Sequence, residues 1–254
     1  MLASNKLWAR SGPGSSGPLV IGHRGASARE PENSVRAFQR AARDGADGVE
    51  LDVLCCQTGE VVVFHDDDLL RLAGRVERID ALPFAAVREV TLSGGVGIPT
   101  LEEAFEACGP ALLVNVELKA TGLRDPAVPA LVERVSSILD RTGTAARVLV
   151  SSFSPVAVWR WRRRRPDVKT ALLFERDAPV PLRRAWSLPL LRPFAAHPDQ
   201  RLCSESLIRR LHRAGYAVNT WTVDDPARLR QLRDWGVDGV IANDPAAARA
   251  ALAQ

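Results

Sequence analysis

Two histidines, each at the end of a strand-like apolar run, are the side chains best suited to chemistry. His23 closes the run 19–22 and is followed by Arg24, and His65 closes the run 61–64. Imidazole titrates near neutral pH, so each histidine can act as a general acid or base. The neighbouring arginine offers a bidentate partner for a phosphate group. These two segments indicate acid–base chemistry on a phosphorylated molecule.

Carboxylates and a lysine lie on two further strand-like runs. Residues two apart in a strand share a face, so Glu50 and Asp52 project together, as do Glu117 and Lys119. Their neighbours are Val and Leu, as in parallel strands that are buried on both faces. Carboxylates in such surroundings are costly unless they are paired or bind a metal ion. The whole set therefore predicts metal-assisted chemistry on a phosphate ester.

A predicted hairpin brings His65 to these carboxylates. Thr58-Gly59 is typical of a two-residue turn, in which glycine supplies the positive φ. Such a turn places Gln57 opposite Glu60. The same register places Asp52 opposite His65, with facing Cβ atoms about 5 Å apart.

Ordered motifs along the chain resemble the glycerophosphodiester phosphodiesterase family. The motifs are His23-Arg24-Gly25, Pro31-Glu32-Asn33, Glu50-Leu51-Asp52, Phe64-His65-Asp66, Val116-Glu117-Leu118-Lys119, Ser151-Ser152-Phe153-Ser154, 219–223 and 236–245. The resemblance covers nearly the whole chain. It implies a metal-dependent phosphoric diester hydrolase that converts glycerophosphodiesters to sn-glycerol 3-phosphate and an alcohol.

The resemblance also implies a role for each polar residue. The expected roles are acid–base catalysis for His23 and His65, phosphate binding for Arg24 and Lys119, metal binding for Glu50, Asp52 and Glu117, and a substrate pocket for Glu32, Ser152, His197 and Trp221. Carboxylates are hard oxygen ligands, which suit Mg²⁺ or Ca²⁺ better than zinc. In the family, the glycerol 2-hydroxyl is thought to attack phosphorus and give a cyclic phosphate that water then opens.

Three of the polar or aromatic residues also have an ordinary structural interpretation. Glu32 follows a proline at a predicted helix start and could cap that helix. Trp221 could pack in the barrel core instead of forming a pocket wall. Asp66 could orient His65 or simply form a turn.

Length and the alternation of strand-like and helix-like segments predict one (β/α)8 TIM barrel. A chain of 254 residues is a common size for this fold, and the alternation predicts a parallel sheet. We expect a flexible leader at 1–17 and a barrel domain at 18–254, with a hairpin and small insertion between strands two and three. The eight strands are expected near 19–23, 47–53, 112–118, 147–151, 169–174, 192–197, 217–222 and 238–242.

Composition argues against several other classes of protein. The net charge is +4, but nearly all basic residues are arginines spread along the chain, so the run from Arg160 to Arg165 does not predict a nucleic-acid partner. No apolar stretch approaches the roughly 20 residues of a membrane helix. Residues 1–17 lack the apolar core of a signal peptide, and the four cysteines do not suggest a disulfide framework. We expect a cytoplasmic enzyme, and the oligomeric state is not predicted.

Two alternative functions would use the same chain. A lysophospholipase D-like enzyme keeps the site and needs an apolar surface beside it, whereas a non-enzymatic phospholipid or nucleic-acid binding module does not need two histidines. The segment 179–194 mixes Leu, Trp and Arg, which is typical of peripheral contact with anionic membranes. Because Pro181 and Pro189 interrupt any long amphipathic helix, we expect an ordinary connection with its leucines turned inward. Stable membrane insertion is not expected.

Overall fold

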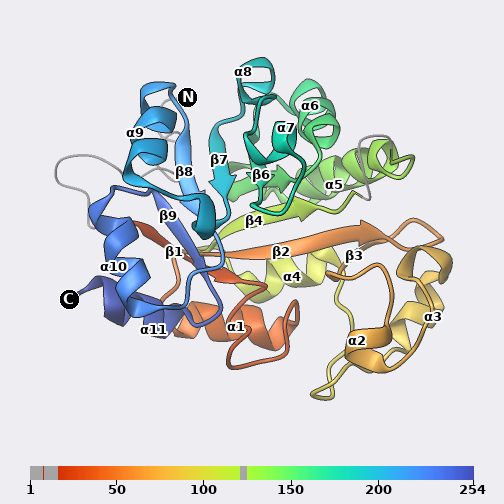
Figure 1. The fold of residues 1–254 in the computed structure, drawn as a ribbon. Helices are drawn as coiled ribbons and strands as arrows, with labels where there is room; N and C mark the ends of the chain where they lie inside the picture. The colour runs from red at the N-terminus through yellow and green to blue at the C-terminus, as the bar shows by residue number, and fades with distance from the viewer. Residues whose placement is uncertain (1–7, 9–16, 121–124) are drawn as a thin grey trace.

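Eight parallel strands close into a barrel in the computed structural model, which describes residues 8, 17–120 and 125–254 (Figure 1). Strand β1 pairs with both β2 and β9, and this pairing closes the sheet. The predicted TIM barrel is confirmed. Its strands are β1 (Leu19–His23), β2 (Gly48–Cys55), β4 (Leu113–Leu118), β5 (Val148–Ser152), β6 (Lys169–Phe174), β7 (Ala195–Pro198), β8 (Ala217–Thr220) and β9 (Gly239–Ala242).

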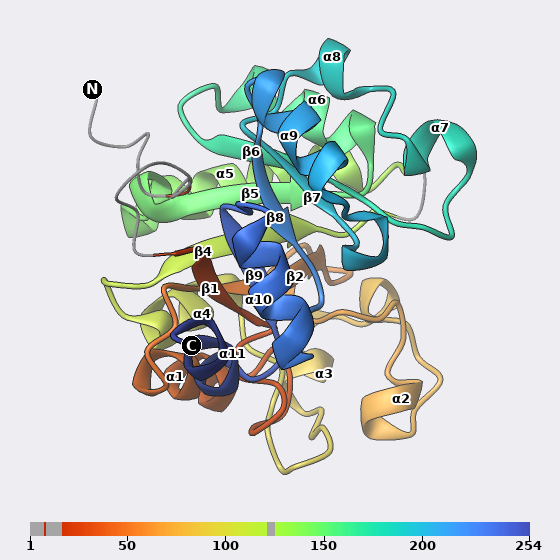
Figure 2. The ribbon, with the colours of Figure 1, turned by 60° about the vertical axis from the view of Figure 1, so that its left-hand side comes forward.

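Helices follow most strands and cover the outside of the barrel (Figures 1 and 2). Side chains such as Ser34, Ser154 and Asp244 begin them by accepting the backbone N–H three residues on, and Thr100 forms a capping box with Glu103. The α-helices of the barrel are α1 (Val35–Arg43), α4 (Leu101–Cys108), α5 (Val128–Thr142), α6 (Pro155–Arg164), α7 (Val180–Arg183), α8 (Leu188–Leu191), α9 (Glu205–Arg213), α10 (Pro226–Asp234) and α11 (Pro245–Leu252). Short 3₁₀ turns occur at Ala145–Arg147 and Gln200–Leu202.

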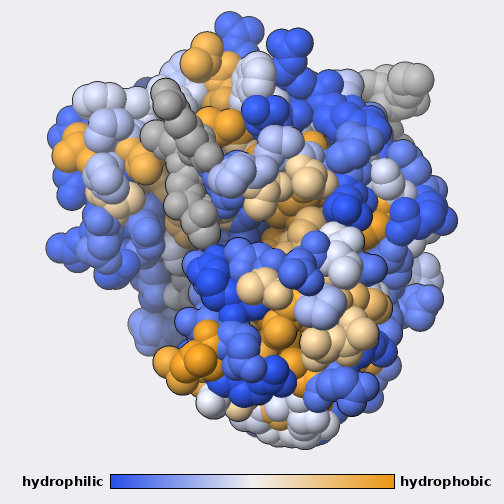
Figure 3. Space-filling model, turned by 90° about the vertical axis from the view of Figure 1, so that its right-hand side faces the viewer, coloured by the Kyte–Doolittle hydropathy of each residue, from blue (hydrophilic) through white to orange (hydrophobic). Residues whose placement is uncertain are grey.

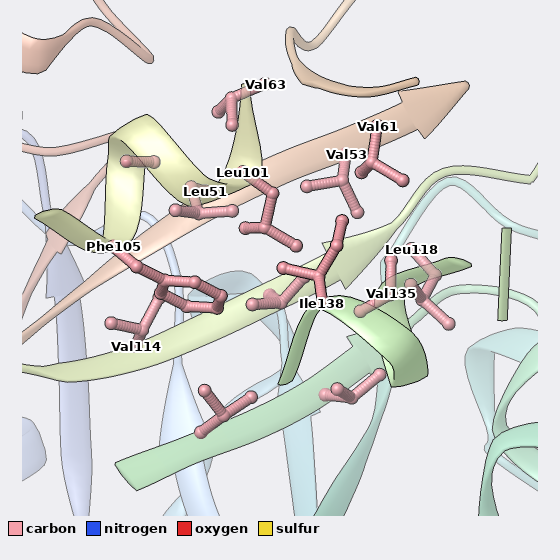
Figure 4. Close-up of a cluster of buried hydrophobic side chains, with 14 of the residues drawn as sticks. Leu51, Val53, Val61, Val63, Leu101, Phe105, Val114, Leu118, Val135 and Ile138 are labelled. Carbon is pink, nitrogen blue, oxygen red and sulfur yellow. The ribbon is translucent and has the colours of Figure 1, made fainter. Parts of the chain in front are cut away.

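The space between the outer helices and the strands is filled by aliphatic side chains. Alternate residues of β2 and β4, among them Leu51 and Val114, point outward and pack against Phe105 of α4 and Ile138 of α5 (Figure 4). Each such fully buried side chain stabilises the fold by roughly 1.5–3 kcal/mol. The residues between them point into the barrel, so this packing fixes which side chains face the interior.

The expected insertion between the second and third barrel strands is present at the lower right of Figure 1. It consists of β3 (Val61–Val63), which pairs antiparallel with β2, then α2 (Leu70–Ala73), a 3₁₀ turn (Ile79–Ala81) and α3 (Phe84–Arg88). Its apolar side chains form a core of their own around Phe64. This local core supports the residues that follow β3.

The register predicted for the hairpin is wrong by one residue. Val53 pairs with Val63, and the Phe64 N–H donates to the Asp52 carbonyl oxygen, so Asp52 faces Phe64 rather than His65. The Cys56 N–H donates to the Glu60 carbonyl oxygen, which leaves a loop of three residues with Gly59 last, at φ 98°. A three-residue loop ending in a left-handed glycine is also a common hairpin type, so glycine alone did not fix the loop length.

Trp8 is one of the most buried side chains in the molecule. It lies in an apolar cluster inside the barrel with residues from the first half of the strands, including Leu19, Leu113 and Leu149. Of the predicted flexible leader, only Trp8 and Gly17 are among the described residues. The prediction for the rest of residues 1–17 lies outside the described part of the chain.

The connection between β6 and β7 differs in part from expectation. Leu188 and Leu191 are buried as expected, but Leu190 is 85% exposed and Trp186 is 61% exposed. The prediction that the leucines turn inward is therefore wrong for Leu190. Helix α7 of this connection stands out from the side of the barrel in Figure 2.

None of the helices in the described residues is long and apolar enough to span a membrane.

Candidate active site

A pocket of about 220 Å³ opens at the C-terminal ends of the strands. Figure 3 faces this end of the barrel, where hydrophobic residues group near the centre of a largely hydrophilic surface. Active sites of TIM barrels form at this end, because the loops that follow the strands meet there. The pocket is lined by His23, Arg24, Glu50, Asp52, His65, Glu117, Phe153, Leu173, Glu175, Trp221 and Ile241.

Three carboxylates lie together on two adjacent strands. Glu50 and Asp52 lie on one face of β2, and the register of β2 with β4 places Glu117 beside Asp52. One oxygen atom from each residue lies within 4.8 Å of the other two, and all three side chains are buried. Burial, together with the neighbouring carboxylates, raises the pKa of Glu50 well above its usual value. Burial also raises the pKa of Glu117 to about 7, so this cluster is electrostatically unfavourable without a further cation.

Two cationic side chains contact the cluster. Lys119 Nζ lies 3.2 Å from Glu117 Oε1 and 3.5 Å from Asp52 Oδ1, and Arg24 Nε lies 3.4 Å from Asp52 Oδ2. Burial alone would raise the pKa of Asp52, but Lys119 and the other positive neighbours lower it overall.

The residues present fit a divalent ion. In the described part of the chain, three carboxylates and two contacting cations leave a formal charge of −1 at the cluster. Hard oxygen donors at this spacing suit Mg²⁺ or Ca²⁺. With such an ion the formal charge becomes +1, which complements a phosphodiester monoanion.

His23 is held in one orientation by an amide. Its Nδ1–H donates to Asn243 Oδ1 at 2.7 Å, and Asn243 Nδ2 in turn donates to Asp224 at 2.6 Å. An amide oxygen can only accept, so Nδ1 carries the proton and Nε2 remains for chemistry. Burial, followed by the charge of Arg24, lowers the pKa of His23.

His65 is held by a carboxylate. Its Nδ1 lies 2.6 Å from Asp66 Oδ1, and Asp66 Oδ2 accepts a hydrogen bond of 2.6 Å from Arg71. Burial lowers the pKa of His65 in spite of the nearby Asp52 and Asp66 carboxylates. Although the hairpin register is shifted, His65 still lines the same pocket as the three carboxylates.

Glu32 links the two histidine segments instead of capping a helix. It accepts hydrogen bonds from Arg24 at 2.7 Å and from Arg71 at 2.7 and 2.9 Å. These two arginines lower the pKa of Glu32 to about 2, overcoming the effect of burial. The cap of α1 is Ser34. The structure thus places Glu32 between Arg24 and the insertion that carries His65.

Of the three other residues expected to form the substrate pocket, one lines the pocket and two lie elsewhere. Trp221 lines the pocket, but Ser152 and His197 are not among its described lining residues. Ser152 Oγ donates to the Leu118 carbonyl oxygen at 2.8 Å, and buried His197 Nε2 accepts from Asn219 Nδ2 at 3.0 Å. Trp221 Nε1 donates to the His197 carbonyl oxygen at 2.9 Å, so the tryptophan is both packed and part of the wall.

The sequence patterns assign no chemical role to several residues that the structure places in the site. Asn33 Nδ2 donates to Asp52 Oδ2 at 2.9 Å, and Asn243 orients His23; both lie within motifs of the sequence but have no charge that would signal chemistry. Arg71, which holds Asp66 and Glu32, lies in the insertion, where no periodic pattern singles it out. Glu175 follows β6 in a loop of mixed charge.

Comparisons with known proteins show which family the chain belongs to. The model of the glycerophosphoryl diester phosphodiesterase family matches residues 23–247. The chain is 32% identical to the glycerophosphodiester phosphodiesterase of Caldanaerobacter subterraneus subsp. tengcongensis, covering 89% of this chain and 94% of that protein. It is 33% identical to probable glycerophosphodiester phosphodiesterase 2 of Mycobacterium tuberculosis, covering 89% and 87%. The chain therefore belongs to the glycerophosphoryl diester phosphodiesterase family and is a phosphoric diester hydrolase.

A solved structure is similar over nearly the same length. It is an Oleispira antarctica phosphodiesterase in complex with the product sn-glycerol-3-phosphate. The TM-score is 0.82 at 25% identity, covering 94% of this chain and 98% of that one.

Proposed function

We propose that the enzyme hydrolyses glycerophosphodiesters to sn-glycerol 3-phosphate and an alcohol, with a divalent ion held by Glu50, Asp52 and Glu117. The observation that carries the proposal is the buried carboxylate cluster, which shares one pocket with two histidines. The sn-glycerol-3-phosphate bound by the Oleispira antarctica phosphodiesterase supports this choice of product. The ion is Mg²⁺ or Ca²⁺, because its ligands are carboxylate oxygens.

His23 is proposed as the base and His65 as the acid. The free Nε2 of His23 accepts the proton of the glycerol 2-hydroxyl as its oxygen forms a bond to phosphorus. His65 donates a proton to the alcohol oxygen as the second P–O bond breaks, because its Asp66 partner stabilises the imidazolium form. Water then opens the cyclic phosphate, with the two histidines in exchanged roles.

The cationic groups around the phosphate have a different task. Arg24 and Lys119 are proposed to neutralise phosphate oxygens, with Glu32 fixing the Arg24 guanidinium. A bound divalent ion would supply charge stabilisation in the transition state. We place the enzyme in the cytoplasm, since all four of its cysteines are free thiols.

Phosphorus NMR tests the activity directly. Glycerophosphocholine, glycerophosphoethanolamine and lysophosphatidylcholine are each incubated with the enzyme, with and without a chelator. We expect glycerol 3-phosphate from the first two substrates and none after chelation. Release of choline phosphate, or cleavage that persists unchanged in chelator, would contradict the proposal.

A lysophospholipase D-like activity is the second candidate, because one exposed surface suits a lipid. Trp186 and Leu190 are exposed beside Arg183 and Arg184, and residues 178–198 contain no acidic side chain. Tryptophan and arginine together are typical of peripheral contact with anionic membranes. Flotation with anionic vesicles supports this candidate if binding is lost in Trp186→Ala and lysophosphatidylcholine is cleaved faster than glycerophosphocholine. If the protein does not bind the vesicles, water-soluble glycerophosphodiesters remain the proposed substrates.

A further inference from the structure

The pocket has a second side, away from the carboxylate cluster. Glu175 follows the end of β6, and β6 lies four strands from β1 in the closed barrel, which is the opposite side of the mouth from His23. Phe153 follows β5, which adjoins β6, and Trp221 follows β8, which lies two strands from β6; both side chains line the pocket. This side contains a fourth acid of the pocket that lies outside the ion cluster.

Glu175 has no ionic partner among the described residues. Its neighbour Asp177 pairs with Arg201 at 2.9 Å, whereas no described cationic side chain makes an ion pair with the Glu175 carboxylate. An unneutralised carboxylate repels the anionic phosphodiester that the pocket is proposed to bind. The repulsion is offset if the far end of the substrate is itself a cation.

Two aromatic rings line the same pocket as this carboxylate and contact each other. Phe153 and Trp221 meet edge to face, with centroids 5.4 Å apart and planes at 90°. Rings at a right angle present one face and one edge, and a ring face attracts an alkylammonium ion. Aromatic ring faces bind quaternary ammonium groups in proteins, and a carboxylate in the same pocket adds Coulomb attraction for the cation.

We propose that Phe153, Glu175 and Trp221 form an ammonium subsite, which binds the cationic head group of the substrate. The inference rests on the proposed function and deepens it, because it selects choline and ethanolamine diesters over diesters with a neutral alcohol. The phosphate then lies between the ion cluster and this subsite. The negative charge of Glu175 favours the zwitterionic substrates and disfavours the purely anionic ones.

The test compares Glu175→Gln with Asp177→Asn, a matched loss of one negative charge at an acid that is paired with Arg201 and is not among the described pocket residues. The rates of glycerophosphocholine and glycerophosphoglycerol cleavage are measured for both variants. We expect Glu175→Gln to lower kcat/KM for glycerophosphocholine about tenfold through KM, the scale of one partly screened charge pair. Because the repulsive charge is removed, the same variant should raise kcat/KM for glycerophosphoglycerol, and Asp177→Asn should leave the ratio of the two substrates unchanged.

An equal effect of Glu175→Gln on both substrates, or no effect on either, would overturn the ammonium subsite while leaving the proposed function intact. If the wild-type enzyme cleaves neither substrate, the proposed function fails instead. In that case, the affinity of each protein for tetramethylammonium ion is measured by NMR titration to test the subsite. Weaker binding in Glu175→Gln and in Phe153→Leu than in the wild type supports it, and equal binding in all three proteins rejects it.

Discussion

The two ends of the barrel interior are built from the same strands but hold opposite kinds of side chain. Near the start of β1 and β4, Leu19 and Leu113 point inward and pack around Trp8 in an apolar cluster. Near the ends of the same strands, His23 and Glu117 point inward and line the pocket. Since the strands alternate with period two throughout, the difference lies only in the chemistry of the inward residues.

This difference separates stability from function. The apolar end gains free energy from burial and needs no partner. The polar end buries three carboxylates whose charges are incompletely neutralised, and such burial costs stability unless an ion is bound. Substitutions at the apolar end should therefore change the free energy of unfolding, and those at the polar end should change catalysis.

Trp8→Ala should give the largest change in stability. Removal of a buried tryptophan typically costs about 3–5 kcal/mol, and we expect a loss of that order in urea unfolding, with kcat nearly unchanged at temperatures where the variant is folded. Trp159→Ala is the control, because Trp159 is 46% exposed. A similar small loss in both variants would mean that Trp8 does not contribute to the apolar end as its burial implies.

His65→Ala should show the reverse pattern. We expect turnover to fall at least about a hundredfold, the usual scale for a general acid or base, while the urea midpoint stays close to that of the wild type. His23→Ala should behave in the same way. His197→Ala is the comparison, since His197 does not line the described pocket. Near-normal turnover in His65→Ala together with a large loss in His197→Ala would refute the assignment of the acid–base pair.

His197 should make the fold sensitive to acid. Burial lowers its pKa to about 3, so the native protein keeps it neutral, whereas the unfolded chain binds a proton below about pH 6.5. The unfolded state therefore gains protons first, and stability is lost as the pH falls from about 6.5 toward 3. Between pH 8 and pH 5, the wild type should lose about 2 kcal/mol more than His197→Gln in urea unfolding. Parallel losses in the two proteins would show that His197 accepts a proton in the native state.

Much of this arrangement follows from sequence patterns. Period-two alternation correctly predicts that Glu50 shares a face with Asp52 and Glu117 with Lys119, whereas the grouping of the three carboxylates into one site comes from the family resemblance and agrees with the register of β2 and β4. The strand boundaries also lie close to those expected, because Val- and Leu-rich runs mark buried parallel strands.

Other features could not be predicted, for identifiable physical reasons. The hairpin register failed because Gly59 is compatible with a loop of two or three residues. Arg71 and Glu175 lie in segments without periodicity, and only the folded chain shows their contacts or their place in the pocket. The burial of Trp8 depends on a contact with strands far along the chain.

Calorimetric titration with Mg²⁺ and with Ca²⁺ tests the central claim that the polar end is an ion site built by Glu50, Asp52 and Glu117. The wild type should bind one ion per chain, and binding should be lost in Glu117→Gln while circular dichroism shows an unchanged fold. Glu175→Gln is the matched control, because it removes a carboxylate from the same pocket but outside the cluster, and it should bind the ion as the wild type does. Undiminished ion binding by Glu117→Gln would contradict the account.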